Sequence, residues 1–352
     1  MISNDSRLPG KSTRIMAEVG LSHEGSLGLA MSIAAGAIQH GADLVKFQAH
    51  FPEFESSRTE SFRVPFAVQD ASRWDYWQRT SFSKDEWKSL KKSVEDRGGI
   101  FAVSVFSVPA VRMFLDLDTR LIKLGSGDLN NEELLSELRE YSGTVVLSTG
   151  MANWHEIEEA AAWLKSSQAN SDSAILQCTS TYPTSLHEVG LNVMQEIAQR
   201  LEISSGLSDH SQGISASIAA IVLGASYIER HITLSPFMFG PDIPSSISLE
   251  QLQFLREFRD DFKRLKTPVD KDRKATELEE MRSTFGRSLG LIRDMPLGST
   301  VNINDFCLRK PVGGFVWNQR LELVGRKLAR PYSIGELLEE SHFVSEIQDS
   351  KS

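Results

Sequence analysis

Short apolar segments alternate with longer amphipathic segments along roughly the first 260 residues of the chain. Several of the apolar segments are continuous hydrophobic runs, the pattern expected for strands that are covered on both faces. Eight segments of this kind predict strands, over Arg14–Val19, Asp43–Gln48, Ile100–Phe106, Arg120–Gly125, Thr144–Ser148, Ala174–Thr179, Ser205–Ser208 and Ser226–Ile232.

The segments between these strands carry helix signals. Ser83 and Glu86 have the spacing of a capping box, an apolar face follows, and Gly98-Gly99 ends the pattern. Ser248 and Gln251 open the last helix in the same way. Eight strand–helix units predict a closed (β/α)₈ TIM barrel. A doubly wound sheet is the structural alternative, but no glycine-rich dinucleotide-binding motif follows the first strand.

The composition changes after the last predicted barrel helix. From Lys263 to Arg282, 12 of 20 residues are charged, which predicts a linker with a solvated helical part. Beyond it the pattern Arg-x₃-apolar-Gly-x₇-Phe occurs twice, starting at Arg293 and at Arg330, which predicts a small, pseudo-symmetric, β-rich domain. At roughly 65 residues this domain is marginal alone, so we expect it to dock on another surface. The predicted divisions are a barrel at 1–262, a linker at 263–283 and a small domain at 284–346.

Bulk composition narrows the class of protein. The chain has 352 residues, 24% of them charged, and its net charge of −9 without a long basic block argues against nucleic-acid binding. Cys178 and Cys307 lie far apart in the sequence, so we expect a reducing, cytoplasmic location and no disulfide framework. Residues 1–14 lack the apolar core of a signal peptide. The longest apolar run, Ile214–Ile228, has 15 residues where a membrane span needs about 20, and we interpret it as a buried helix leading into a strand.

Polar residues end nearly every predicted strand. The active site of a TIM barrel lies at the carboxyl ends of its strands, so these side chains should meet at one mouth. Two lysines and several serines there predict an anion site for a phosphorylated or carboxylated substrate. The set comprises Glu18, Lys46, Gln48, Ser104, Lys123, Ser126, Ser148, Ser180, Tyr182, Ser208, His210, Glu229 and His231.

Several of these residues have two interpretations. The run Lys123–Asp128 could present backbone N–H groups to a phosphate or could be a tight turn, and the lysine favours phosphate. Glu18 could act as an acid, a base or a ligand of a metal-bound water, and could also pair with Lys46. Glu229 could support a metal-binding histidine or take part in the chemistry. Cys178, inside an apolar strand, is expected to be a packing residue.

His210 and His231 end successive strands and should be neighbours. Neutral imidazoles so placed can bind a divalent metal, with water, Glu18 or substrate oxygens completing an open, catalytic type of coordination. The remaining histidines are expected to be ordinary hydrogen-bonding groups; they are His23, His40, His50, His155, His187 and His342.

The motifs along the chain resemble those of the bacterial N-acetylneuraminate (sialic acid) synthases. The match runs in order from about residue 12 to residue 345, and the tail, with Arg287–Leu289 and Gly325–Leu328, looks like that family's antifreeze-like (SAF) domain. The resemblance implies a TIM barrel followed by a SAF domain, in a domain-swapped homodimer whose small domains cap the partner barrels. The motifs that carry it are Ala17–Gly25, Val45–Gln48, Lys123–Leu129, Leu147–Met151, Gln177–Thr184, Gly206–His210 and Ile228–His231.

The resemblance also implies a reaction and a set of roles. Such enzymes are transferases that condense phosphoenolpyruvate with N-acetylmannosamine or a related amino-sugar aldose and release phosphate. His210 and His231 would bind Mn²⁺, with Mg²⁺ or Co²⁺ as alternatives, and together with Glu18 would form the catalytic set. Phosphoenolpyruvate would be held by Lys46, Ser104, Lys123, Ser126, Ser148, Ser180 and Ser208, and the sugar by Gln48, Tyr182, Asp242 and Lys310.

The sequence departs from the family pattern mainly on the sugar side. Arg309-Lys310-Pro311 reverses the usual Lys-Arg-Pro order, and Ile243 follows Asp242 where a histidine is common. A legionaminic- or pseudaminic-type acceptor, or an unacylated hexose, therefore remains open. Two rivals also remain: a synthase of 3-deoxy sugar phosphates, which would need a second basic cluster, and a non-catalytic carbohydrate-binding relative.

Overall fold

The computed structural model describes residues 12–62, 64, 66 and 69–345. The chain forms two compact units, Met1–Lys266 and Thr267–Ser352. The outermost parts of the predicted domains, residues 1–11 and 346, lie outside the described residues. Among the described residues, no helix has the length and apolar character needed to cross a membrane.

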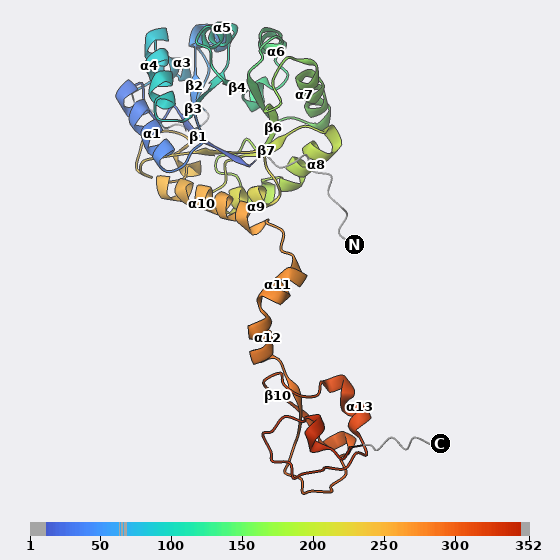
Figure 1. Cartoon of the computed structure of the whole chain (residues 1–352). Helices are drawn as coiled ribbons and strands as arrows, with labels where there is room; N and C mark the ends of the chain where they lie inside the picture. Colours follow the sequence, from blue (N-terminus) through green and yellow to red (C-terminus); the bar gives the residue numbers. More distant parts are fainter. Residues whose placement is uncertain (1–11, 63, 65, 67–68, 346–352) are drawn as a thin grey trace. The chain divides into compact units, whose positions relative to one another are not determined.

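The first unit is a closed barrel of eight parallel strands that pair in chain order (Figure 1). Each predicted strand is present, with ends that differ by at most one residue, so the barrel is confirmed and the doubly wound alternative is wrong. The strands are β1 Arg14–Gly20, β2 Leu44–Ala49, β3 Ile100–Val105, β4 Leu121–Leu124, β5 Thr144–Ser148, β6 Ala174–Cys178, β7 Ser205–Asp209 and β8 Tyr227–His231.

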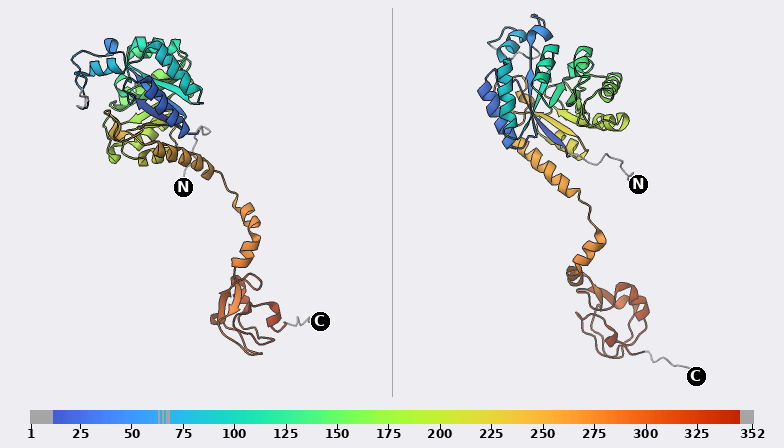
Figure 2. Two further views of the ribbon diagram at one scale, coloured as in Figure 1. Left: turned by 90° about the vertical axis from the view of Figure 1, so that its left-hand side faces the viewer. Right: turned by 45° about the horizontal axis from the view of Figure 1, so that its top comes forward.

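Helices surround the strands (Figure 2). One main helix follows each strand, and the connection after β2 also contains the short helices α2 (Pro52–Glu55) and α3 (Arg73–Thr80). The predicted capping box of Ser83 and Glu86 is present at the start of α4. The main helices are α1 Leu27–Gln39, α4 Lys84–Glu95, α5 Val108–Asp116, α6 Glu132–Leu138, α7 Trp154–Ser166, α8 Leu191–Leu201, α9 Ser215–Val222 and α10 Leu249–Leu265.

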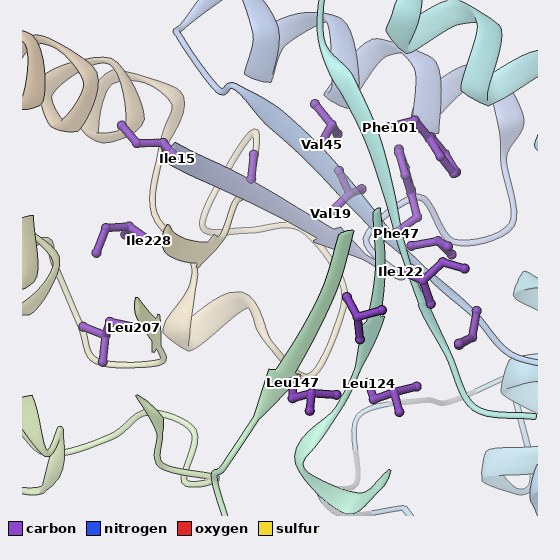
Figure 3. Close-up of a cluster of buried hydrophobic side chains, with 14 of the residues drawn as sticks. Ile15, Val19, Val45, Phe47, Phe101, Ile122, Leu124, Leu147, Leu207 and Ile228 are labelled. Atoms are coloured by element: carbon purple, nitrogen blue, oxygen red, sulfur yellow. The ribbon is translucent and has the colours of Figure 1, made fainter. Parts of the chain in front are cut away.

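The alternation of side chains along each strand separates two apolar layers. One set faces the helices and includes Ile15, Val19, Val45, Phe47 and Leu147, which Figure 3 shows pointing away from the strands. The other set comes from the first halves of the strands and forms a separate buried cluster that closes the amino-terminal end of the barrel; it contains Met16, Leu44, Ala102, Leu121, Val146, Ala174, Leu176 and Tyr227. The inward positions that follow along each strand are polar, so the site lies above this cluster.

The second unit begins with two short helices, α11 (Lys271–Glu277) and α12 (Glu279–Phe285). The predicted linker is therefore largely helical. Strands β9 (Ser288–Leu291) and β10 (Phe306–Arg309) then pair antiparallel, and the short helix α13 spans Arg320–Leu323. Isolated β-bridges rather than further strands connect most of the remaining loops, so the unit contains less regular β-structure than the sequence predicted.

The internal repeat of the second unit is visible in the structure. Gly298 and Gly335 both adopt positive φ angles, of 80° and 106°. The two repeat phenylalanines, Phe306 and Phe343, each follow a 3₁₀ turn and are buried in the same core. The two copies thus form equivalent turns, and their phenylalanines share one small core, as the sequence predicted. Its likeness to a SAF domain stays a prediction.

Candidate active site

The strand register brings the polar inward residues together at the carboxyl end of the barrel. Glu18 on β1 lies opposite Lys46 on β2 and His231 on β8. Ser104 on β3 lies opposite Lys123 on β4. Lys46 lies opposite Ala102, and Ser104 is the next inward position along β3. Because side chains alternate along each strand, these polar residues all point into the barrel and form one ring there.

A network of buried ion pairs fills this ring. The Nζ of Lys46 lies 2.6 Å from Oε2 of Glu18 and donates a hydrogen bond to Ser104 Oγ at 2.7 Å. The Nζ of Lys123 donates to both carboxylate oxygens of Glu229, at 2.6 and 2.7 Å. Since β4 and β8 lie on opposite sides of the closed barrel, this second contact crosses the interior. Lys46 and Glu229, 3.8 Å apart, join the two pairs.

The charges of the network balance. Burial by itself would raise the pKa of Glu229, but the ammonium groups of Lys123 and Lys46 hold that pKa well below its usual range. Glu229 therefore faces the two lysines in ionised form. The sequence predicted lysines for an anion and also allowed a pair between Lys46 and Glu18, which is confirmed. The pairing of Lys123 with Glu229 was not predicted. An incoming anion must share these cations with Glu18 and Glu229.

The two predicted metal-binding histidines are neighbours, as expected from their positions on successive strands. The ring centroids of His210 and His231 are 5.5 Å apart, and Tyr182 stacks on His210 at 4.0 Å. Oδ2 of Asp242 lies 4.0 Å from Nδ1 of His231. Burial, reinforced by the neighbouring His231, lowers the pKa of His210 to about 3, so the imidazole is neutral at physiological pH.

The donor set fits an open metal site. Nδ1 of His210 faces the backbone oxygen of Thr179 at 3.1 Å, which favours the tautomer with the proton on Nδ1 and leaves the Nε2 lone pair free. In the part of the chain that the structure describes, no group of three or more His, Cys, Asp or Glu side chains is arranged to hold a metal. A metal bound here would therefore take two imidazoles from the protein and its other ligands from water or substrate.

A buried ion pair outside the barrel ring supports both histidines. Asp209 and Arg230 precede His210 and His231, point to the other face of their strands and lie 2.6 Å apart with fully buried side chains. Arg230 also donates to the backbone oxygens of Ser211 and Ser245 at 2.8 and 3.2 Å. This pair ties together the segments after β7 and β8, so it fixes the strand ends that carry the imidazoles.

The predicted serines lie on the ring or in the loops above it. Ser126 Oγ accepts a hydrogen bond from Gly150 N at 2.8 Å. A Cβ on residue 150 would lie 2.2 Å from Ser180 Oγ and 2.6 Å from Ser126 Oγ, so the loops after β4, β5 and β6 meet at this glycine. The hydroxyl of Ser148 is buried without a hydrogen-bond partner. Ser126 also lines a cavity of about 440 Å³.

Lys310, predicted to contact the sugar, belongs to the second unit. Its Nζ lies over the ring of Phe285, 5.0 Å from the centroid. The adjacent Arg309 donates to the backbone oxygen of Leu291 at 2.9 Å and packs against Gly290. Both cations of this pair therefore make contacts within their own unit. Its contact with a sugar remains a prediction.

One residue beside the site was not recognised from the sequence. His50, grouped with the ordinary histidines, has its Nδ1 2.7 Å from Glu55 Oε1 and its Nε2 3.3 Å from Gln48 Oε1. The sequence signal that could have identified His50 was its spacing from Gln48. The two residues are two positions apart, so in an extended segment their side chains lie on the same side of the chain. His23, by contrast, is buried against Phe82, and burial lowers its pKa to about 4.

A closed parallel barrel with buried acidic, basic and imidazole groups at its carboxyl end defines the class of this protein as a TIM-barrel enzyme. The model of the NeuB family matches residues 33–269. The chain belongs to the NeuB family, which confirms the resemblance noted in the sequence.

Individual relatives extend the match beyond the residues of the family model. The N,N'-diacetyllegionaminic acid synthase of Campylobacter jejuni is 31% identical over 340 residues, which cover 94% of this chain and all of the relative. Human N-acetylneuraminate-9-phosphate synthase is 32% identical over 242 residues, 68% of this chain and 67% of the relative. Among solved structures, the sialic acid synthetase of Leptospira borgpetersenii in complex with citrate matches with a TM-score of 0.65 and 27% identity, covering 78% of this chain and 93% of that chain.

Proposed function

We propose that this protein is a nonulosonic (sialic) acid synthase, a transferase that condenses phosphoenolpyruvate with an amino-sugar aldose and releases phosphate. The observation that carries the proposal is the network of Lys46, Glu18, Lys123 and Glu229 beside the paired imidazoles, inside one barrel mouth. Membership of the NeuB family and the end-to-end match to a legionaminic acid synthase support it.

The C3 carbon of phosphoenolpyruvate forms a bond to the aldehyde carbon, and the aldehyde oxygen takes up a proton to become a hydroxyl. Water adds at C2 and loses one proton, which replaces the proton taken up by the aldehyde oxygen. The C2–O bond to phosphate then breaks, the remaining proton of the C2 hydroxyl leaves with the phosphate, and the ketone of the product remains. Inorganic phosphate carries away the bridging oxygen.

The charged ring suits the first substrate. Lys46 and Lys123 would hold its phosphate and carboxylate, and their pairing with Glu18 and Glu229 keeps the empty site from carrying unpaired buried charge. The unpartnered hydroxyl of Ser148 supplies a donor that an anion can use. The same role is proposed for Ser104, Ser126, Ser180 and Ser208.

Glu18 is the candidate for moving a proton. Its two oxygens are held separately, one by Lys46 and the other by the amide of Gln48 at 2.7 Å. It also lies opposite His231 in the strand register. These contacts fix the carboxylate at the side of the ring that faces the imidazoles, where the aldehyde would bind.

His210 and His231 would hold a divalent ion, with Mn²⁺ proposed ahead of Mg²⁺ or Co²⁺. When bound, such an ion supplies Lewis-acid polarisation of the aldehyde oxygen. Chelation should abolish phosphate release, and binding of Mn²⁺ measured by electron paramagnetic resonance should be lost in His210→Ala. Mn²⁺ binding unchanged by that substitution would exclude this site.

The acceptor sugar is proposed to lie against Gln48, Tyr182 and Asp242, with Lys310 supplied by the second unit of a partner chain. A domain-swapped homodimer follows from this proposal, and light scattering of the purified protein would test it. The cytoplasmic location stays a prediction.

The decisive test is phosphate release from phosphoenolpyruvate and Mn²⁺ with a panel of aldoses. The panel should contain N-acetylmannosamine, a 2,4-diacetamido hexose, an unacylated hexose and an aldose phosphate. Release with an unphosphorylated amino sugar supports the proposal, whereas release with the aldose phosphate alone favours the 3-deoxy sugar phosphate rival. If no acceptor yields phosphate while a sugar still binds, the protein is a non-catalytic relative.

A further inference from the structure

A continuous line of polar contacts runs from the charged ring to the edge of the barrel mouth. Lys46 pairs with Oε2 of Glu18, and Oε1 of Glu18 accepts a hydrogen bond from the Nε2 of Gln48 at 2.7 Å. Oε1 of Gln48 lies 3.3 Å from Nε2 of His50, whose Nδ1 lies 2.7 Å from Oε1 of Glu55. The line thus ends in a second carboxylate, outside the set of residues assigned to substrates.

The orientation of the Gln48 side-chain amide follows from its neighbours. Glu18 is a carboxylate that pairs with Lys46, so it can only accept hydrogen bonds. The NH₂ group of Gln48 must therefore face Glu18, because the reversed amide would bring two acceptor oxygens within 2.7 Å of each other. The carbonyl oxygen of Gln48 then necessarily faces His50.

The orientation of the Gln48 amide in turn fixes one proton of His50. The carbonyl oxygen of Gln48 can only accept, so Nε2 of His50 carries the proton of this contact and donates it. On the other side of the ring, the short contact between Nδ1 and Glu55 Oε1 holds the imidazole in this orientation. The side chains of His50 and Glu55 are buried, at 6% and 4% exposed.

The surroundings hold the ring in place from the other elements. His50 is stacked between Trp77 of α3 and Phe106 after β3, at centroid distances of 4.3 and 4.2 Å. The guanidinium of Arg73 lies over the Trp77 ring, 4.4 Å from its centroid. Stacking on both faces prevents the ring of His50 from turning.

We propose that His50, held by Glu55 and donating from Nε2, is a positioning residue that locks the amide of Gln48 toward Glu18. The consequence for catalysis rests on the proposed function, since Gln48 and Glu18 lie where the aldose would bind. With the amide locked, Gln48 presents one fixed set of donors and acceptors to the sugar, and the carboxylate of Glu18 keeps its orientation.

The protonation state can be measured without any substrate. In protein labelled with ¹⁵N-histidine, Nε2 of His50 should show a protonated-type shift at pH 7, and the signal should vanish in His50→Phe, which assigns it. An Nε2 without a proton at that pH would overturn the proposal. This measurement keeps its meaning even if the purified protein releases no phosphate with any aldose, an outcome that would refute the proposed function alone.

Kinetics test the positioning role. His50→Phe retains a stacking ring but removes the donor to Gln48, so the KM for the aldose should rise and kcat should fall, each by about ten-fold or more. The KM for phosphoenolpyruvate should stay within about two-fold, because Lys46 and Lys123 are untouched. His50→Gln, which can donate an N–H to Gln48, should recover most of the loss. A general structural defect would instead change both KM values and the thermal midpoint.

Glu55→Gln should reproduce the defect of His50→Phe, and the double variant should be no worse than either single one, because both changes release the same amide. The matched control is His155→Phe, since His155 pairs with Glu159 at 3.5 Å on the exposed side of α7, and it should leave all constants unchanged. Additive losses in the double variant, or an unaltered aldose KM in His50→Phe, would refute the positioning role.

Discussion

Removing the ammonium group of Lys123 should destabilise the barrel more than almost any other single change at the site. Glu229 would remain buried with only Ser208 Oγ at 3.3 Å and Lys46 Nζ at 3.8 Å as polar neighbours. Removing one partner of a buried ion pair costs about 3–5 kcal/mol. Because Lys46 still compensates part of the charge, we expect Lys123→Met to lower the free energy of unfolding by about 3 kcal/mol.

The double variant Lys123→Met, Glu229→Met separates charge burial from packing. It removes both charges and leaves Lys46 paired with Glu18 at 2.6 Å, so its stability should lie within about 2 kcal/mol of the wild type. Urea unfolding can be followed by tryptophan fluorescence in a Trp317→Phe background, which restricts the signal to the barrel. The five barrel tryptophans are Trp74, Trp77, Trp87, Trp154 and Trp163.

The pH dependence provides a second test of the same reasoning. The pKa of Glu229 is lower in the folded protein than in the unfolded chain, so its contribution is present above the usual carboxyl pKa of about 4.3. That contribution is lost as the pH falls below this value toward the folded pKa. In Lys123→Met the loss should begin at a higher pH. A double variant as unstable as the sum of its single variants would refute the ion-pair account.

Three further outcomes follow from the structure. Gly150→Ala should raise the KM for phosphoenolpyruvate about ten-fold or more with little loss of stability, because its Cβ would lie 2.2 Å from Ser180 Oγ. Steady-state kinetics gives the KM and thermal melting gives the stability, and an unchanged KM would contradict the prediction. His23→Phe should flatten the pH dependence of the free energy of unfolding, because burial lowers the pKa of His23 to about 4. The neutral ring contributes about 3 kcal/mol of stability, which is lost as the pH falls from about 6.5 to 4. A slope that persists in urea titrations of the variant would exclude His23 as its source. Ser83→Ala should cost about 1 kcal/mol by removing the capping box with Glu86, whereas Ser89→Ala on the same helix should cost less.

Much of the barrel could be predicted because each of its strands corresponds to a local pattern in the sequence. A buried strand needs an apolar run, and the polar residue that ends each run marks the mouth of the barrel. Lys46 and Ser104 were placed in this way, and both occupy the inner ring. The repeat in the second unit was visible for the same reason, since Gly298 and Gly335 mark turns of the same conformation.

Partners that are distant in the sequence could not be predicted in this way. The pairing of Lys123 with Glu229 joins residues 106 positions apart and exists only because closing the barrel brings β4 and β8 face to face. No local pattern states which cation meets which carboxylate. The pair of Lys46 and Glu18 was among the alternatives that the sequence left open, whereas nothing in the sequence indicated the partner of Lys123.

His50 shows the same division between sequence and structure most clearly. The sequence determined that Gln48 and His50 point to one side of the chain after β2, because side chains of an extended segment alternate. Only the tertiary structure decided that Glu55 contacts Nδ1 of His50 and that Trp77 and Phe106, from separate elements, stack on the two faces of its ring. A histidine's role depends on which groups face its two nitrogens, and that is set by packing rather than by the order of residues.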